Sequence, residues 1–186
     1  HHHTGRPSRR PDRLGGAGGP APLAGGQFVT LRLTAGMYHR FHAPADLTVE
    51  RVTYFPGDCW NVNPPTLKRV PRLFCRNERA VLSCRMADGT PLIIVAVAAV
   101  LVASIRLTFL DLPARIRRGK SHAFPVDAAV AKGEEMGWFE QGSTLVVLLP
   151  PGSTPIAGEG VRIRAGQPLA RGRSAAPAGS SRGHPG

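Results

Sequence analysis

Short apolar runs separated by Gly and Pro turns dominate the chain, and most of them alternate with the two-residue period of a β-strand. The longest apolar run, residues 92–103, is rich in Val and Ile and predicts one or two buried strands. Asp88-Gly89, just before it, is typical of a hairpin turn. The other expected strands are residues 28–33, 48–55, 78–86, 104–110 and 144–149.

Helical periodicity is weak by comparison. Residues 67–74 have the pattern of a short helical turn, and no segment predicts a helix longer than two or three turns. Gly (22) and Pro (18) together exceed a fifth of the 186 residues, which favours many short strands. We therefore expect a mainly β fold, either a sandwich or a partly closed barrel, with short helices.

The two ends of the chain carry no hydrophobic period and are rich in Arg, Pro and Gly. We expect residues 1–26 and 172–186 to be disordered tails and residues 27–171 to form one folded domain. The amino end has no apolar signal segment, and the 12-residue run at 92–103 is too short to cross a bilayer as a helix.

The formal net charge is +12, from 24 Lys+Arg against 12 Asp+Glu. Such a surplus attracts nucleic acid or an anionic membrane surface. Aromatic residues are 6% of the chain and no nucleic-acid motif is present, so we expect the membrane surface and no nucleic acid. A non-enzymatic nucleic-acid-binding protein is kept as an alternative. The basic segment 115–120 (RIRRGK) is the candidate membrane contact, and a solvated loop explains it equally well.

The three cysteines, Cys59, Cys75 and Cys84, contain no CxxC pair. Their odd number argues against a disulfide framework, and their spacing argues against a structural zinc site. We expect a reducing compartment and no bound metal.

A Gly-Ser-Thr junction precedes the apolar strand at 144–149 and is the first candidate for chemistry. A flexible glycine that enters a buried strand can hold a strained peptide bond, so the Ser143 hydroxyl could attack the Gly142 carbonyl. On this pattern alone an ordinary turn is the more frequent explanation. A second Gly-Ser-Thr at 152–154 lies in a Pro/Gly loop, and we interpret Ser153 as an inactive copy.

Two histidines three residues apart, His39 and His42, are candidate acid and base groups. In a regular strand this spacing sends the side chains to opposite faces. Both reach one site only if the chain turns there, which Pro44 favours. Metal binding is the rival interpretation, and no third ligand stands nearby in the sequence.

Taken together, these segments resemble the phosphatidylserine decarboxylase family. They follow the family's order and cover most of residues 27–152, with a weak further match at 163–170. The combination of His-x-x-His, NERAV and Gly-Ser-Thr is highly specific. The matching segments are LRLTAGMYHRFHAPAD (31–46), VERVTYFPGDCWNVNP (49–64), LKRVPRLFCRNERAV (67–81), VASIRLTF (102–109) and KGEEMGWFEQGSTLVVLLPPG (132–152).

The resemblance implies a proenzyme that cuts itself between Gly142 and Ser143. Attack by the serine gives an ester, and elimination leaves a covalent pyruvoyl group, derived from Ser143, on the new amino end. The products would be a β chain (1–142) and an α chain (143–186) held together without covalent bonds, with a homodimer as a further option. His42 matches the family's self-cleavage base, and His39 matches its decarboxylation histidine.

The resemblance also implies an activity, which is the conversion of phosphatidylserine to phosphatidylethanolamine and CO2. A pyruvoyl carbonyl condenses with the substrate amine and delocalises the carbanion left by loss of CO2. We expect a peripheral enzyme on the cytoplasmic face of a bacterial inner membrane. A pyruvoyl-dependent decarboxylase of a soluble amino acid is the alternative within the same family.

The chain departs from the family pattern in three places. The family's aspartate, which completes an Asp-His-Ser triad, lies in a segment that would precede residue 1, and Asp12 is a poor substitute. Asp46-Leu47 stands where Asp-Gly is usual, and Gln141 stands where Leu is common.

The resemblance also makes a geometric prediction. The strand at 144–149 should lie beside residues 31–42, with the His42 ring within roughly 3–5 Å of Ser143 or the Gly142 carbonyl. His39 should face the same open, mainly apolar cavity. We expect no acidic residue behind His42.

Overall fold

The computed structural model describes residues 26–33, 36, 38–58, 77–98, 105–117, 119–140 and 142–172. Cys59, Cys75 and the predicted helical turn at 67–74 lie outside these residues, as do nearly all of the two predicted tails. The boundaries of the folded domain therefore stay a prediction.

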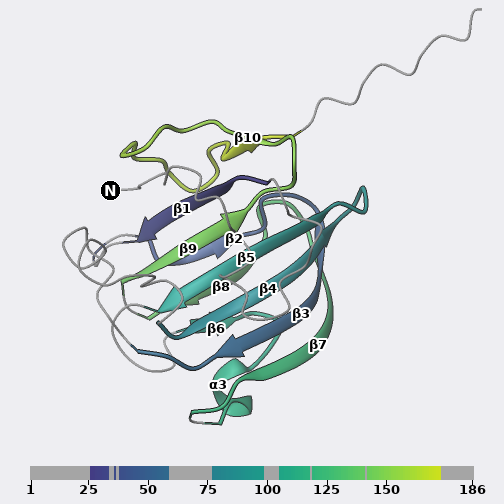
Figure 1. Ribbon diagram of the computed structural model, residues 1–186, viewed down its shortest axis with the longest axis vertical. Helices are drawn as coiled ribbons and strands as arrows, with labels where there is room; N and C mark the ends of the chain where they lie inside the picture. The colour runs from purple at the N-terminus through teal and green to yellow at the C-terminus, as the bar shows by residue number, and fades with distance from the viewer. Residues whose placement is uncertain are drawn as a thin grey trace, which may run out of the picture.

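Six antiparallel strands form the larger sheet, in the order β1-β9-β5-β4-β3-β7 (Figure 1). β3 pairs with both β4 and β7, and a bulge between Val49 and Arg51 interrupts both ladders. Strands that are distant in sequence thus become neighbours, above all β9 between β1 and β5. The bounds are β1 Phe28–Leu33, β3 Leu47–Phe55, β4 Arg79–Met86, β5 Pro91–Ala98, β7 His122–Val130 and β9 Ser143–Leu148.

Three shorter strands form a second sheet in the order β2-β8-β6, which lies behind the larger sheet in Figure 1. A four-residue helix, α3, follows β6, and two short strands, β10 and β11, pair with each other. The predicted mainly β fold is confirmed, and within the described residues the sheets stay open, as in a sandwich. The bounds are β2 Arg40–His42, β6 Ile105–Leu107, β8 Glu135–Phe139, α3 Leu112–Arg115, β10 Thr154–Pro155 and β11 Ala170–Arg171.

β7 was not among the strands predicted from the sequence. Its residues alternate between half-buried and exposed rather than between buried and exposed, and Pro125 lies in its middle. Proline cannot donate a ladder hydrogen bond and is therefore found on edge strands or at bulges. Both conditions hold here, because β7 is the last strand of the sheet and Pro125 lies opposite Arg51 at the bulge.

Buried apolar side chains cover both faces of the larger sheet in two clusters. On β9, Leu145 and Val147 belong to the larger cluster, while Val146 and Leu148 belong to the smaller one. The larger cluster lies between the two sheets, because it also contains side chains of the second sheet. These are Phe41, Ile105, Leu107, Met136 and Phe139.

Gly137 lies at the centre of the second sheet, where no side chain fits. A Cβ atom there would collide with the carbonyl oxygen of Arg106 and lie 2.9 Å from the ring of Phe41. The backbone oxygen belongs to the paired strand β6 and cannot move away without breaking the ladder. We expect Gly137→Ala to lower the free energy of unfolding by about 3 kcal/mol, at the upper end of overpacking effects, as measured by urea denaturation.

Gly158→Ala is the matched control. Its added Cβ would meet its nearest neighbour, a methyl group of Val161, at 3.9 Å, which is ordinary van der Waals contact. This variant should unfold within about 0.5 kcal/mol of the parent chain. Equal stability of the two variants would contradict the packing of β8 between β2 and β6.

Candidate active site

Ser143 is the first residue of β9 and sits in the interior of the larger sheet. Its register partners are Leu33 on β1 and Ala98 on β5. Only 1% of the residue is exposed. The predicted pairing of this strand with the segment that begins at residue 31 is therefore confirmed for the part of that segment that forms β1.

The side chain of Ser143 points into the space between the two sheets. Side chains alternate along a strand, and Leu145 and Val147, which share the parity of Ser143, belong to the inter-sheet cluster. The Ser143 hydroxyl oxygen is buried and has no hydrogen-bond partner among the described residues. An unpaired buried hydroxyl costs about 1–3 kcal/mol, and the neighbouring Thr144 hydroxyl is likewise buried without a partner among the described residues.

The bond before Ser143 lies where the chain crosses from one sheet to the other. β8 belongs to the second sheet and β9 to the larger one, so Gly142 lies in the short connection between them. Gly142 is half-buried and forms a bend. The peptide bond that is predicted to be cleaved thus links the connection between β8 and β9 to a fully buried strand.

His39 lies at the same end of β8 as this connection. Its carbonyl oxygen accepts a hydrogen bond of 2.9 Å from the amide of Phe139, four residues before Ser143. The Nε2 atom of His39 is buried and has no partner within the described part of the chain. His39 and Ser143 therefore each have a buried side-chain atom without a partner among the described residues, near the connection between β8 and β9.

Both ring nitrogens of His42 are within hydrogen-bond distance of groups other than Ser143. Its Nδ1 lies 2.9 Å from the carbonyl oxygen of Gly133, and its Nε2 lies 2.7 Å from the Tyr38 hydroxyl. A carbonyl can only accept, so Nδ1 carries a proton, and in the tautomer with one ring proton Nε2 is the acceptor of the tyrosine hydroxyl. The two rings also stack, with their centroids 5.7 Å apart. The Nε2 atom of His42 is thus covered by the Tyr38 hydroxyl.

The two histidines occupy different positions along the second sheet. His42 pairs with Glu135 at the start of β8, whereas His39 contacts Phe139 at its end. Since a strand rises about 3.3 Å per residue, these positions are separated by on the order of 10 Å. No hydrogen bond joins His42 to Ser143 among the described contacts, so the predicted approach of His42 to Ser143 stays a prediction. The group behind Nδ1 is the backbone carbonyl of Gly133.

Two further polar residues near Ser143 were not singled out from the sequence. Asn77 and Glu78 are 0% and 2% exposed, and both connect to Ala98, the register partner of Ser143. The sequence signal was the polar segment Asn77-Glu78-Arg79, which directly precedes the apolar residues of the strand that follows. Tyr38 was also missed, although it precedes His42 by four residues.

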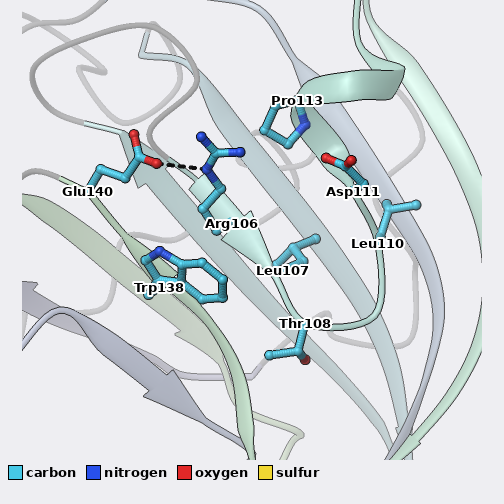
Figure 2. Close-up of a pocket in the computed structure, with 8 residues that line it drawn as sticks. All are labelled: Arg106, Leu107, Thr108, Leu110, Asp111, Pro113, Trp138 and Glu140. Carbon is cyan, nitrogen blue, oxygen red and sulfur yellow. Dashed lines mark hydrogen bonds and ion pairs between the residues drawn. The ribbon is translucent and has the colours of Figure 1, made fainter.

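A pocket of about 350 Å³ opens beside β6 and β8 (Figure 2). Figure 2 shows the guanidinium of Arg106 reaching toward Glu140, and their ion pair measures 2.8 Å. Neither histidine of the predicted site lines this pocket, and Ser143 does not line it either, so it differs from the predicted apolar cavity. Its lining residues are Arg106, Leu107, Thr108, Leu110, Asp111, Pro113, Trp138 and Glu140.

The described residues contain no cluster of three or more His, Cys, Asp or Glu side chains that could hold a metal ion. Cys84 is a free thiol whose pKa is raised to about 12, first by burial and then by the charge of Glu50. Cys84 is therefore protonated and unreactive at neutral pH.

Comparison of the sequence with known proteins identifies the family to which the chain belongs. The sequence model of the phosphatidylserine decarboxylase family matches residues 5–171. A phosphatidylserine decarboxylase proenzyme of Aliivibrio salmonicida is 40% identical over 166 residues, which is 82% of this chain and 58% of that protein. The proenzyme of Bordetella pertussis is 41% identical over 147 residues, and that of Haemophilus influenzae is 38% identical over 136 residues.

The matched relatives are longer than this chain. The alignments cover 75% of the chain and 49% of the Bordetella protein, and 71% of the chain and 47% of the Haemophilus protein. The chain therefore spans between about half and three-fifths of the length of these relatives. The family model nevertheless covers nearly all of the chain, including both histidines, Asn77, Glu78 and the Gly142-Ser143 junction. The chain belongs to the phosphatidylserine decarboxylase family.

Proposed function

We propose that this chain is a self-processing phosphatidylserine decarboxylase, which cuts itself between Gly142 and Ser143 and then converts phosphatidylserine to phosphatidylethanolamine and CO2. The observation that carries the proposal is the Ser143 hydroxyl, which is buried without a partner among the described residues and directly follows a glycine connection. Family membership supports the chemistry and argues against a non-enzymatic nucleic-acid-binding protein.

Self-cleavage needs groups of this chain and water. The Ser143 oxygen attacks the Gly142 carbonyl carbon, the peptide bond to the Ser143 nitrogen breaks, and an ester joins Gly142 to the Ser143 oxygen. Elimination then breaks this ester and frees the Gly142 carboxylate, and water replaces the nitrogen of residue 143, which leaves as ammonia. A base must take the hydroxyl proton, and the family resemblance gives this role to His42. His42 has an acceptor nitrogen for this purpose once the Tyr38 hydroxyl is displaced from it.

The site fits a pyruvoyl group, because that group would replace the Ser143 side chain at the amino end of β9. When present, it supplies an electron sink for the negative charge left by loss of CO2. His39, whose Nε2 is buried and has no partner among the residues that the structure describes, is the residue we propose to orient the carboxylate or to return a proton to carbon. The apolar inter-sheet cluster beside Ser143 would keep water from this position.

The sheet explains how the two products would stay together after cleavage. β9 would begin the α chain, yet it lies between β1 and β5, which both belong to the β chain. Its six residues, Ser143–Leu148, are all buried. Ladder hydrogen bonds on both sides and burial on both faces would hold this strand without a covalent link.

Intact-mass measurement tests the proposal directly. The purified chain should separate under denaturing conditions into pieces of about 15 and about 4.7 kDa, in proportion to 142 and 44 of its 186 residues and a total of 19.8 kDa. The smaller piece should have a blocked, ketone-bearing amino end. Phosphatidylserine and free amino acids assayed side by side then decide between a lipid and a soluble substrate. A predicted homodimer stays a prediction.

We further propose peripheral attachment at the cytoplasmic face of a bacterial inner membrane. No helix in the described part of the chain is long and apolar enough to cross a bilayer. Arg115, Arg117 and Lys120, at and after the end of α3, are all exposed. Each basic group near an anionic surface contributes about 1 kcal/mol. Replacing all three by Gln should weaken binding to phosphatidylglycerol-containing vesicles on the order of 100-fold, measured by co-sedimentation at low salt.

The control removes the same amount of charge elsewhere. Arg162, Arg164 and Arg171 are exposed residues of the carboxyl-terminal segment, and their replacement by Gln leaves the region around α3 intact. This variant should bind vesicles much as the parent does. Equal weakening by both triple variants would show that net charge, and not the segment after α3, drives attachment.

A further inference from the structure

The carboxylate of Asp46 joins two segments that are far apart in the sequence. Asp46 is exposed and lies in the connection between β2 and β3. Its Oδ1 atom accepts a hydrogen bond of 2.8 Å from the backbone amide of Lys132, which is 86 residues further along the chain. Lys132 belongs to the turn between β7 and β8. One side chain thus attaches this turn to the connection that follows His42.

The larger sheet fixes the backbone from which this carboxylate projects. Asp46 directly precedes β3, and its carbonyl oxygen accepts a hydrogen bond of 3.1 Å from the amide of Ala87. The next residue, Leu47, is in register with Met86 of β4 and with Val130 of β7. Because three paired strands hold it, the backbone of Asp46 is a firm point of attachment for the turn that follows β7.

The turn at residues 131–134 is exposed, and hydrogen bonds determine its conformation. The Glu134 amide donates to the Ala131 carbonyl at 2.9 Å, and the Glu134 carboxylate accepts from the Ala131 amide at 2.9 Å. Gly133 has a positive φ of 83°, which glycine adopts without strain. These features close the turn on itself, but they do not attach it to β2.

Two backbone bonds attach the turn to Ala43, just after β2. The Gly133 amide donates to the Ala43 carbonyl at 2.8 Å, and the Ala43 amide donates to the Glu134 carbonyl at 2.9 Å. Both bonds meet at one residue, so by themselves they permit the turn to rotate about it. The bond from Lys132 to Asp46 adds a point of attachment away from Ala43 and removes this freedom.

The position of the turn matters because its Gly133 carbonyl contacts the proposed base. That oxygen lies 2.9 Å from Nδ1 of His42. A carbonyl can only accept, so it favours the histidine tautomer with the proton on Nδ1 and leaves Nε2 as the basic nitrogen. In a catalytic triad an acidic residue performs this task. Here a backbone carbonyl performs it, and that carbonyl is only as well placed as the turn that carries it.

We propose that Asp46 is a positioning residue of self-cleavage, which fixes the turn so that the Gly133 carbonyl keeps the proton of neutral His42 on Nδ1. Nε2 then takes the proton of the Ser143 hydroxyl as the oxygen attacks the Gly142 carbonyl carbon, and the same proton passes to the departing nitrogen of residue 143. This inference rests on the proposed self-cleavage with His42 as its base. Solvent screens the charge of the exposed Asp46 side chain, so its role depends on the acceptor oxygen.

The first measurement follows cleavage of the full chain over time after cell-free synthesis. Asp46→Ala removes the acceptor, and we expect it to cleave roughly five-fold more slowly, as for the loss of one hydrogen bond at an exposed site. Asp46→Asn keeps an acceptor oxygen at the same distance from the backbone and should cleave within about two-fold of the parent.

Asp88→Ala is the matched control. Asp88 is also exposed, and its Oδ1 atom accepts a hydrogen bond of 2.9 Å from the Thr90 amide in the turn between β4 and β5. This variant loses the same charge and the same kind of bond in another turn. It should lower the urea midpoint of unfolding about as much as Asp46→Ala, and it should cleave at the parent rate.

The second measurement identifies the His42 tautomer by NMR of chains labelled with ¹⁵N-histidine. The Ser143→Ala chain is used, because it stays in one piece, at about pH 8, where imidazole rings are mostly neutral. The signals are assigned by comparison with His42→Ala. Nδ1 should be the protonated nitrogen, and adding Asp46→Ala should shift the population toward the tautomer protonated on Nε2. Asp46→Asn and Asp88→Ala should leave the tautomer unchanged.

The outcomes separate this inference from the proposed function. Cleavage of Asp46→Ala at the parent rate, or an unchanged tautomer, would overturn the role of Asp46. Equal slowing by Asp88→Ala would show a general loss of stability instead, and equal slowing by Asp46→Asn would contradict the role of the hydrogen bond. A parent chain that never splits would overturn the proposed function, and the tautomer would still decide what the Asp46 bond does.

If Asp46→Ala does not fold, Asp46→Ser replaces it in both measurements. The serine oxygen is one bond closer to the backbone than the carboxylate oxygens, so it does not reach the Lys132 amide. The same slowing and the same change of tautomer are expected, and their absence would count against the proposal.

Discussion

Ser143→Ala is expected to leave the chain as a single piece of about 19.8 kDa and to abolish decarboxylation. Alanine has no nucleophile, so no ester forms and no pyruvoyl group is made. The substitution removes one buried hydroxyl that has no partner in the described part of the chain, and it should therefore leave stability unchanged or slightly higher. Gel electrophoresis, intact mass and an assay of CO2 release measure the three effects on one preparation.

Ser153→Ala is the matched control, since Ser153 stands in the second Gly-Ser-Thr of the chain. Ser153 follows Gly152, a glycine with a positive φ of 83°, and its amide donates to the carbonyl of Pro150 at 3.1 Å. The second Gly-Ser-Thr therefore forms a tight turn, whereas Ser143 begins an interior strand of the larger sheet. Ser153→Ala should split and react like the parent. Loss of splitting in this variant alone would move the cleavage site to residue 153.

The strands of the core could be predicted because their residues are buried on one or both faces. β1 coincides with the predicted segment at 28–33, and β9 begins one residue before the predicted segment at 144–149. β8 was harder to recognise, because it has five residues and Gly137 at its centre. Glycine weakens a strand pattern, and here it is required by the close approach of β6.

The site could be predicted only in part, for a physical reason. The chemistry of Ser143 depends on residue type and on its place before an apolar run, which the sequence displays. The position of Asn77 and Glu78 beside Ala98, the register partner of Ser143, depends on the register of three strands, and the sequence does not display register. The bonds that hold His42 depend on Gly133, which comes from the turn before β8 and lies 91 residues away.

Alanine variants of the two histidines are expected to be defective in different steps of the reaction. His42→Ala should block splitting at residue 143, because the family resemblance makes His42 the base for the Ser143 hydroxyl. General base catalysis contributes about 10²–10⁴-fold, so splitting should become undetectable within hours. His39→Ala should split but release CO2 at least 100-fold more slowly, because the buried Nε2 of His39 would no longer assist the substrate. Mass spectrometry of the chain and the CO2 assay read out the two steps separately.

Tyr38→Phe tests whether the Tyr38 hydroxyl, which covers His42 Nε2, slows the splitting of the chain. The Tyr38 hydroxyl donates to His42 Nε2, the nitrogen that must take the Ser143 proton. Without that hydroxyl the nitrogen is uncovered, while Nδ1 keeps its bond to Gly133. Tyr38→Phe should therefore split at least as fast as the parent. If His39→Ala blocks splitting and His42→Ala does not, the roles are reversed, and the base is the histidine that already lies at the Ser143 end of β8.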